Sequence, residues 1–288
     1  MKIEGSSSRK EKRSRKDMGA IRSAEKVIRK KGGGGACERG YRKPRRRVEA
    51  TSTAIQRLFL ACKAVFKGPG TVPAPTDVQM LQQLLDKMRP EDVDLSADIP
   101  FFRARSTDRG TPRISYTTIY QCKNFSMCIF FLPPTAVIPL HNHPGMTVFS
   151  KLLLGSMHIK SYDFVDPAKS INTTASSSRM NLARLVVDSD FTAPCDTSVL
   201  YPTTGGNIHT FTAITPCAIL DVLGPPYSKE DDRDITYYRD HPYLSVLDSD
   251  SAGGDEDRRY GWLEETDVPD EATTMDPIKY LGPRIIPI

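Results

Sequence analysis

A run of eight short segments between residues 114 and 224 constrains the fold of this chain most. The segments are rich in β-branched and aromatic residues and alternate with Pro, Gly, Asn and Asp, which is the pattern of strands and turns. Many short strands at this spacing predict an all-β sandwich or barrel. One of them, FSMCIFFL, is apolar at both parities and predicts a strand covered on both faces. The others are ISYTTIYQC, MTVFSKLLL, SMHIKSYDF, LARLVVDSDF, TSVLYPT, HTFTAITP and CAILDVLG.

Two helices are predicted before these strands. Apolar residues recur at helical spacing over residues 55–66, and Gly-Pro-Gly follows directly as a stop signal. A second stripe covers residues 78–88, with Thr76 as its expected N-cap and Gln79 three residues later. Such stripes indicate core packing, and we assign them no catalytic role. We expect the polar stretches 166–178 and 248–258 to form surface loops and the C-terminal YLGPRIIPI to dock on the body.

Charge divides the chain at about residue 50. Residues 1–50 carry 18 Lys and Arg against 6 Asp and Glu, a net +12, whereas the remainder carries 22 against 29, a net −7. The first part also has few large apolar residues, so burial cannot offset the entropy of folding. We therefore predict a disordered basic tail over 1–50. One folded domain is expected over 51–288, with helices over 51–100 and a β-barrel with a C-terminal extension over 101–288.

Several classes of protein and location are disfavoured. No stretch approaches the roughly 18 apolar residues of a membrane span, and the basic N-terminus has no apolar core of a secretory signal. The six cysteines form no framework and no C-x-x-C pair, so a reducing, intracellular compartment is expected. Basic clusters at 9–16 and 42–47 indicate nuclear import, with a merely solubilising tail as the alternative.

His141 and His143 are the first candidates for chemistry, in a chain with five histidines. In a strand, residues two apart point to the same face, so both side chains can meet one metal ion. Prolines and a glycine around them, in IPLHNHPGM, restrict the local backbone. The pair therefore predicts part of a metal site that needs a third ligand.

His209 is the best third ligand. It follows Gly205-Gly206, which permits a tight turn into a strand expected to begin at the histidine. His158 shares its strand face with Lys160 and is expected to face solvent, and His241 lies in a turn-like context after a charged run. We therefore expect His141, His143 and His209 to be the metal ligands.

At these residues the sequence resembles the cupin superfamily, which implies a double-stranded β-helix, or jelly roll. The H-x-H pair with the later Gly155 matches the first cupin motif, and Gly206 with His209 matches the second. Two departures stand out: Val148 occupies the position of the cupin glutamate ligand, and Thr135 that of the leading glycine. Three neutral imidazoles without a carboxylate leave a divalent ion open to an anionic ligand, and a thiolate suits Fe(II) well.

A three-histidine cupin site is the signature of thiol dioxygenases. The strings PLHNHPGM and GGNIHTFTAITPCAILDVLGPPYS resemble the plant cysteine oxidases, relatives of the cysteamine dioxygenases, from about residue 55 to the C-terminus. The resemblance implies an Fe(II) enzyme that uses O2 to convert an N-terminal protein cysteine to cysteine sulfinic acid. In plants the family's substrates are group VII ethylene-response factors, so the resemblance also implies oxygen sensing through the N-degron pathway.

Two further positions carry over by resemblance. Asp221 lies in an apolar strand, where an unpartnered carboxylate is costly, and it is expected to orient the substrate's α-ammonium or a water. A carboxylate satisfied by the backbone or an arginine is the alternative. Tyr227 follows two prolines and is expected to donate a hydrogen bond to substrate or oxygen, or else to be an ordinary cap on the barrel. Ile235 stands where relatives have a cysteine, so any role of that thiol is lost or moved.

Two other functions remain open at this point. Three histidines also suit Zn²⁺ or Ni²⁺ in a hydrolase or isomerase. A degenerate cupin scaffold with a nucleic-acid-binding tail is the non-enzymatic alternative. With the leading interpretation we expect a monomer in the nucleus and cytoplasm, with O2 and N-terminal cysteines as partners and without direct binding of membranes or nucleic acid.

Overall fold

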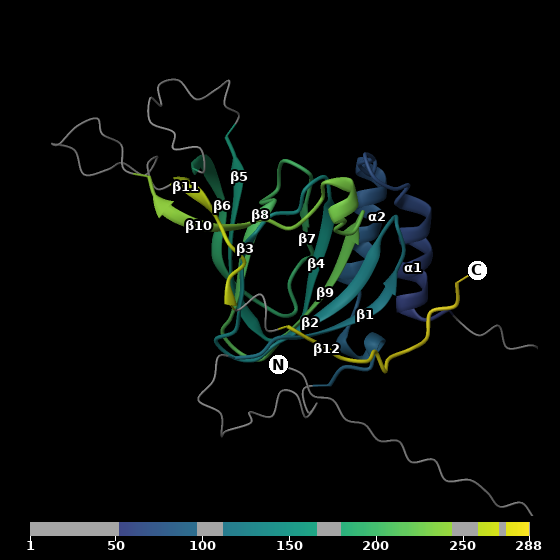
Figure 1. The fold of residues 1–288 in the computed structure, drawn as a ribbon. Coiled ribbons are helices and arrows are strands. Elements are labelled where there is room, and N and C mark those ends of the chain that lie inside the picture. The colour runs from purple at the N-terminus through teal and green to yellow at the C-terminus, as the bar shows by residue number, and fades with distance from the viewer. Residues whose placement is uncertain (1–51, 97–111, 166–179, 244–258, 271–274, 288) are drawn as a thin grey trace, which may run out of the picture. The chain divides into compact units, whose positions relative to one another are not determined.

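A computed structural model describes residues 52–96, 112–165, 180–243, 259–270 and 275–287 (Figure 1). The basic tail over 1–50 and the polar loops expected over 166–178 and 248–258 lie outside these ranges. The expectations of disorder, of a domain boundary at residue 50 and of nuclear import therefore stay predictions.

The two expected helices are present. They are α1 (Ala54–Val65) and α2 (Pro75–Asp86), and a 3₁₀ turn, η1 (Pro90–Val93), follows. α1 begins where the Thr53 hydroxyl accepts a hydrogen bond from the Gln56 N–H at 3.3 Å. The expected N-cap at Thr76 is wrong, because α2 already begins at Pro75, whose fixed φ suits a first helical turn. Within the described residues, no helix has the length and apolar character to cross a membrane.

Twelve strands and a second 3₁₀ turn, η4 (Lys229–Asp231), follow in the described residues. The eight predicted strand segments all contain a strand, β3 is the strand expected to carry His141, and three further strands near the C-terminus were not anticipated. The strands are β1 (Ser115–Gln121), β2 (Ser126–Leu132), β3 (Val137–His141), β4 (Thr147–Leu154), β5 (Ser156–Phe164), β6 (Met180–Thr192), β7 (Ser198–Leu200), β8 (Ile208–Ala213), β9 (Cys217–Gly224), β10 (Tyr237–Pro242), β11 (Tyr260–Thr266) and β12 (Asp276–Pro277).

Strands β2 to β9 form a jelly roll. Their order is β2-β9-β4-β7 in the first sheet and β6-β5-β8-β3 in the second, so the chain passes repeatedly between the sheets. β12 and β1 extend the first sheet, whereas β10 and β11 extend the second. The pairing of Tyr237 with His141 closes the second sheet into a ring. This topology confirms the predicted cupin fold class.

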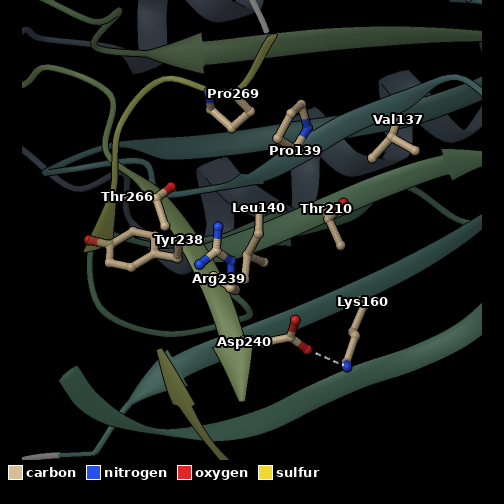
Figure 2. A pocket seen from close by; sticks show the side chains of 10 residues that line it. All are labelled: Val137, Pro139, Leu140, Lys160, Thr210, Tyr238, Arg239, Asp240, Thr266 and Pro269. Carbon is tan, nitrogen blue, oxygen red and sulfur yellow. Dashed lines mark hydrogen bonds and ion pairs between the residues drawn. The ribbon is translucent and has the colours of Figure 1, made fainter. Parts of the chain in front are cut away.

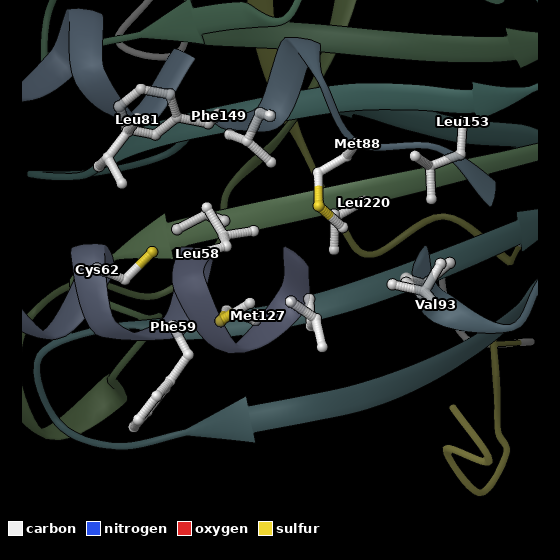
Figure 3. Close-up of a cluster of buried hydrophobic side chains, with 14 of the residues drawn as sticks. Leu58, Phe59, Cys62, Leu81, Met88, Val93, Met127, Phe149, Leu153 and Leu220 are labelled. Carbon is white, nitrogen blue, oxygen red and sulfur yellow. The ribbon is translucent and has the colours of Figure 1, made fainter. Parts of the chain in front are cut away.

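The helices cover the outer face of the first sheet (Figure 1). Figure 3 shows Leu58 and Phe59 of α1 and Leu81 of α2 against Met127 of β2 and Leu220 of β9, all at most 1% exposed. Each fully buried side chain of this size contributes about 1.5–3 kcal/mol. This cluster holds the first sheet in place behind the candidate site.

The inner face of the first sheet lines the space between the sheets. In β2, Met127 and Ile129 contact the helices, whereas Cys128 and Leu132 belong to clusters inside the roll. The prediction that FSMCIFFL is covered on both faces is therefore confirmed.

The C-terminal segment docks on α1, as expected. The Gln56 side chain donates a hydrogen bond to the Ile286 carbonyl at 3.0 Å and accepts one from the Ile286 N–H at 2.8 Å. Tyr280 and Ile285 pack against the helix cluster. Because both backbone groups of Ile286 are satisfied by one side chain, the segment has a defined position.

Candidate metal centre

His141, His143 and His209 meet inside the roll. Their ligand atoms all lie within 4.8 Å of one another, and each of the three side chains is buried. His141 is the last residue of β3 and pairs with His209 near the start of β8. His143 lies in the loop after β3, so the expectation that both histidines of the pair share one strand face is wrong. The loop instead returns the His143 ring to within 4.9 Å of the His141 ring, centroid to centroid.

Hydrogen bonds on the far side of two rings determine which nitrogen faces the centre. His141 Nδ1 lies 2.7 Å from the Pro139 carbonyl, which only accepts, so Nδ1 carries the proton. The Tyr227 hydroxyl donates to the Asn142 carbonyl at 2.8 Å, which uses its one proton. His143 Nδ1, 2.8 Å from the same hydroxyl oxygen, must therefore be the donor. Both rings thus present an unprotonated Nε2.

The protonation of the three rings suits metal binding. Burial lowers the pKa of His141 to about 4, although the hydrogen bond to Pro139 acts in the opposite direction. Burial also lowers the pKa of His143 and His209 well below the ordinary range, and the neighbouring histidines add to the effect. Neutral imidazole is the form that binds metals, so all three residues are ready ligands at neutral pH.

The spacing also fits an ion. His143 Nε2 and His209 Nε2 lie 2.9 Å apart. Two ligands about 2.1 Å from one ion and at right angles to each other stand about 3.0 Å apart. The three histidines could therefore hold a divalent metal ion. Val148, at the position of the missing glutamate, is 1% exposed and packs in an apolar cluster, so it provides no fourth ligand.

Asp221 is a buried carboxylate between the two sheets. It lies in β9 between Cys128 of β2 and Ser150 of β4 in the strand register, and these three side chains form a polar row across the inner face. Ser150 hydrogen-bonds the carboxylate, but Oδ1 has no partner among the described residues. Burial raises the pKa of Asp221 to about 7. The alternative of a carboxylate satisfied by an arginine or the backbone gains no support, since neither bonds Oδ1 of Asp221 within the described residues.

Tyr227 has a hydroxyl that is hydrogen-bonded to two groups of the chain in this structure. Its hydroxyl proton goes to the Asn142 carbonyl, and its oxygen accepts the His143 Nδ1 proton. Its ring stacks on His143 at 5.4 Å between centroids, and burial raises its pKa well above the ordinary range. The geometry therefore makes Tyr227 a positioning residue for His143.

Asp163 was not anticipated from the sequence. This buried residue of β5 accepts hydrogen bonds from three successive backbone N–H groups, those of Gly205, Gly206 and Asn207, at 2.8–3.0 Å. The three donors lie in the Gly-Gly turn that leads to His209. The turn itself was recognisable, but its carboxylate partner lies more than 40 residues away, and no local signal connects them.

Asn207 was also missed. Its side chain accepts from the His143 N–H at 3.2 Å and donates to the His143 carbonyl at 2.9 Å. It donates to the Tyr201 carbonyl as well, at 2.6 Å. One amide therefore joins the loop that carries His143 to the turn that carries His209.

The remaining histidines lie outside the centre. His158 faces solvent as expected, with its two ring nitrogens 2.8 Å and 2.9 Å from Asp190 and Asp188. His241 is in β10 rather than a turn and contacts Glu264 at 2.9 Å, so that expectation is wrong. Both side chains are about 37% exposed, which suits neither for an enclosed metal site.

A pocket of about 350 Å³ lies on the outside of the second sheet, away from the three histidines. Figure 2 shows its wall, where Lys160 forms an ion pair with Asp240 at 2.6 Å. The Tyr162 hydroxyl donates to the same carboxylate at 3.0 Å. Two charged groups of this wall are therefore paired with each other, and the third, Arg239, lies 4.0 Å from Glu264 outside the wall.

Comparison with known proteins identifies the family. A family model described as PCO_ADO matches residues 84–285, more than half of the chain. Plant cysteine oxidase 1 of Arabidopsis thaliana is 50% identical over 241 residues, which cover 81% of this chain and 80% of that protein. Plant cysteine oxidase 2 of the same plant is 49% identical over 244 residues, which cover 84% of this chain and 86% of that protein. The 2-aminoethanethiol dioxygenase of Mus musculus is 29% identical, covering 82% and 98%.

These relatives agree with the resemblance seen in the motifs. They give no support to a hydrolase or isomerase, or to a scaffold without activity. The chain belongs to the PCO_ADO family and is a thiol dioxygenase.

Proposed function

We propose that this protein is an Fe(II)-dependent dioxygenase that converts the N-terminal cysteine of target proteins to cysteine sulfinic acid with O2. The observation that carries the proposal is a centre of three buried, neutral histidines without a carboxylate, in a chain of this family. An ion held only by imidazoles keeps its full charge, and that charge favours the binding of a thiolate.

Bound Fe(II) would supply the redox chemistry that lets O2 react with a thiolate. The reaction balances without a reductant, because both oxygen atoms go to sulfur and sulfur supplies the electrons. The sulfinic acid is essentially irreversible on the cysteine oxidation ladder, which suits a step that commits a protein to degradation.

The chain's own residues divide the remaining tasks. Pro139 and Tyr227 hold two ligand rings in the tautomer that exposes Nε2. Asp221 has an unpaired Oδ1 in the interior, and the α-ammonium of an N-terminal cysteine would be a partner of opposite charge. An ammonium at this position would favour the ionised carboxylate and lower the pKa of Asp221 from about 7.

The wider role rests on the resemblance to plant cysteine oxidases. It supports transcription factors such as group VII ethylene-response factors as targets and oxygen sensing through the N-degron pathway as the role. The basic clusters at 9–16 and 42–47 support a nuclear as well as cytoplasmic location. We also propose that the protein acts as a monomer.

Mass spectrometry tests the reaction. The Fe(II)-loaded full-length chain is incubated in air with a peptide that begins with cysteine, and the peptide should gain two oxygen atoms, both labelled when ¹⁸O2 is used. An N-acetylated copy of the peptide tests the role of the α-ammonium and should react poorly. Zn²⁺-loaded protein and the His209→Ala variant serve as controls without activity. A peptide of unchanged mass beside a full complement of bound iron would refute the proposal.

A further inference from the structure

A small pocket lies between the two sheets of the roll. It contains a cavity of about 30 Å³. Leu152 of β4 and Ile219 of β9 line it from the first sheet, and Met157 of β5 and Phe211 of β8 line it from the second. All four side chains are at most 5% exposed, so the inner part of the cavity is enclosed and apolar.

The buried part of this cavity lies next to residues that contact the candidate metal centre, and none of the three histidines lines it. Phe211, one of its walls, lies 4.4 Å from the His209 ring between centroids. Ser150, another lining residue, hydrogen-bonds Asp221. One lining side chain therefore contacts the His209 ring and another contacts Asp221, so a single layer of side chains separates the cavity from the site.

The outer end reaches the surface at the loop before β7. Asp196 and Ser198 are exposed lining residues, and Cys195 and Phe191 are half-buried. The lining therefore combines exposed residues near this loop with side chains, such as Phe211, that are at most 5% exposed. The cavity is thus partly open to the surface rather than fully closed.

We propose that this cavity, which we call the side channel, is a binding site and entry route for molecular oxygen. The inference rests on the proposed function, because only a dioxygenase needs a separate supply of O2. A volume of about 30 Å³ admits a diatomic gas but excludes a peptide with a charged N-terminus. Water needs two to four polar partners in such a place, whereas apolar cavities stay dry and take up apolar guests. Molecular oxygen is an apolar guest of the right size.

Oxygen-induced relaxation of methyl groups tests occupancy without any turnover. The full-length chain is loaded with diamagnetic Zn²⁺, and methyl NMR spectra are compared under nitrogen and under pressurised O2. Methyl groups of Leu152, Ile219 and Met157 should relax several-fold more strongly than those of Leu58 and Leu81, which are as deeply buried among the helices. Equal enhancement in both sets would overturn the proposal.

Steady-state kinetics test the route. Leu152→Phe narrows the buried part of the side channel. Cys195→Trp narrows its mouth, and this half-buried position accommodates a larger ring more easily than a fully buried one. Each should raise KM for O2 at least about threefold while kcat at saturating O2 and KM for the peptide stay unchanged. Ile214→Trp adds the same bulk at an exposed position, 48% exposed and outside the lining, and should change nothing.

The outcomes separate this inference from the proposed function. A rise in KM for the peptide with an unchanged KM for O2 would show that the side channel admits the peptide and would overturn the inference. A wild-type enzyme that adds no oxygen to the peptide would refute the proposed function. In that case the NMR comparison still decides whether the side channel binds O2.

Discussion

The bond between Tyr227 and His143 makes a prediction that can be worked through from the structure. In Tyr227→Phe the ring still stacks on His143, but the Nδ1 proton of His143 loses its acceptor at 2.8 Å. The site is buried, and a buried donor left without a partner costs about 1–3 kcal/mol. A free-energy change of about 1.4 kcal/mol alters an affinity tenfold, so the affinity for the metal should fall about 5- to 150-fold. Removing other hydrogen-bond partners of metal-binding histidines has effects of similar size.

Chelator competition with Zn²⁺ measures this affinity without redox chemistry. Circular dichroism of each metal-free protein checks that the fold is retained. Tyr162→Phe is the matched control, because it removes a hydroxyl bonded to Asp240 on the outside of the sheet and should leave affinity unchanged. An affinity of Tyr227→Phe within about twofold of wild type, with the fold intact, would refute the role assigned to the hydroxyl.

Three further predictions concern other residues of the centre. Asp221 has a pKa raised by burial from 3.8 to about 7, so the folded state binds the extra proton and the free energy of unfolding falls as pH rises from about 4 to 7. Urea unfolding of the metal-free proteins should therefore favour Asp221→Asn over wild type more at pH 8 than at pH 5, by up to about 3 kcal/mol, because about two pH units lie between pH 5 and the folded-state pKa. A difference independent of pH would contradict this. Asn207→Ala should weaken Zn²⁺ binding about tenfold or more. Asn207→Asp should have an intermediate affinity, because the aspartate keeps the acceptor for the His143 N–H but loses the donor to the His143 carbonyl. Equal affinities of both variants and wild type in a chelator titration would argue that Asn207 does not position His143. Gly206→Ala places a Cβ 2.4 Å from Ser161 Oγ at φ +82°, whereas Gly70→Ala at φ +76° meets open space. Thermal unfolding should therefore show a larger loss of stability for Gly206→Ala than for Gly70→Ala, where backbone strain alone should cost roughly 1 kcal/mol or more. Similar losses of stability in the two variants would show that the structure relieves the contact with Ser161.

Local patterns were sufficient for the elements that build the roll. The segments SMHIKSYDF and CAILDVLG coincide with β5 and β9, because alternation and turn residues act over only a few neighbours. The apolar stripe of α1 was equally clear, since helical contacts repeat within four residues. The strands β10 and β11 were missed, and His241 was misplaced with them. These strands pair with each other and with β3 and β6, and such partners are invisible in a short window.

The sequence alone determined the jelly-roll class, the three histidine ligands proposed here and the meaning of Val148 where a carboxylate ligand would stand. Only the tertiary structure showed what orients those histidines. Tyr227 lies 84 residues from His143 and Asn207 lies 64 residues from it. Asp163 lies 42 to 44 residues from the turn that it holds. A donor and an acceptor bond when the fold brings them within about 3 Å in the correct direction. That condition depends on strand order and register, and so the ligands were recognisable from spacing while their partners were not.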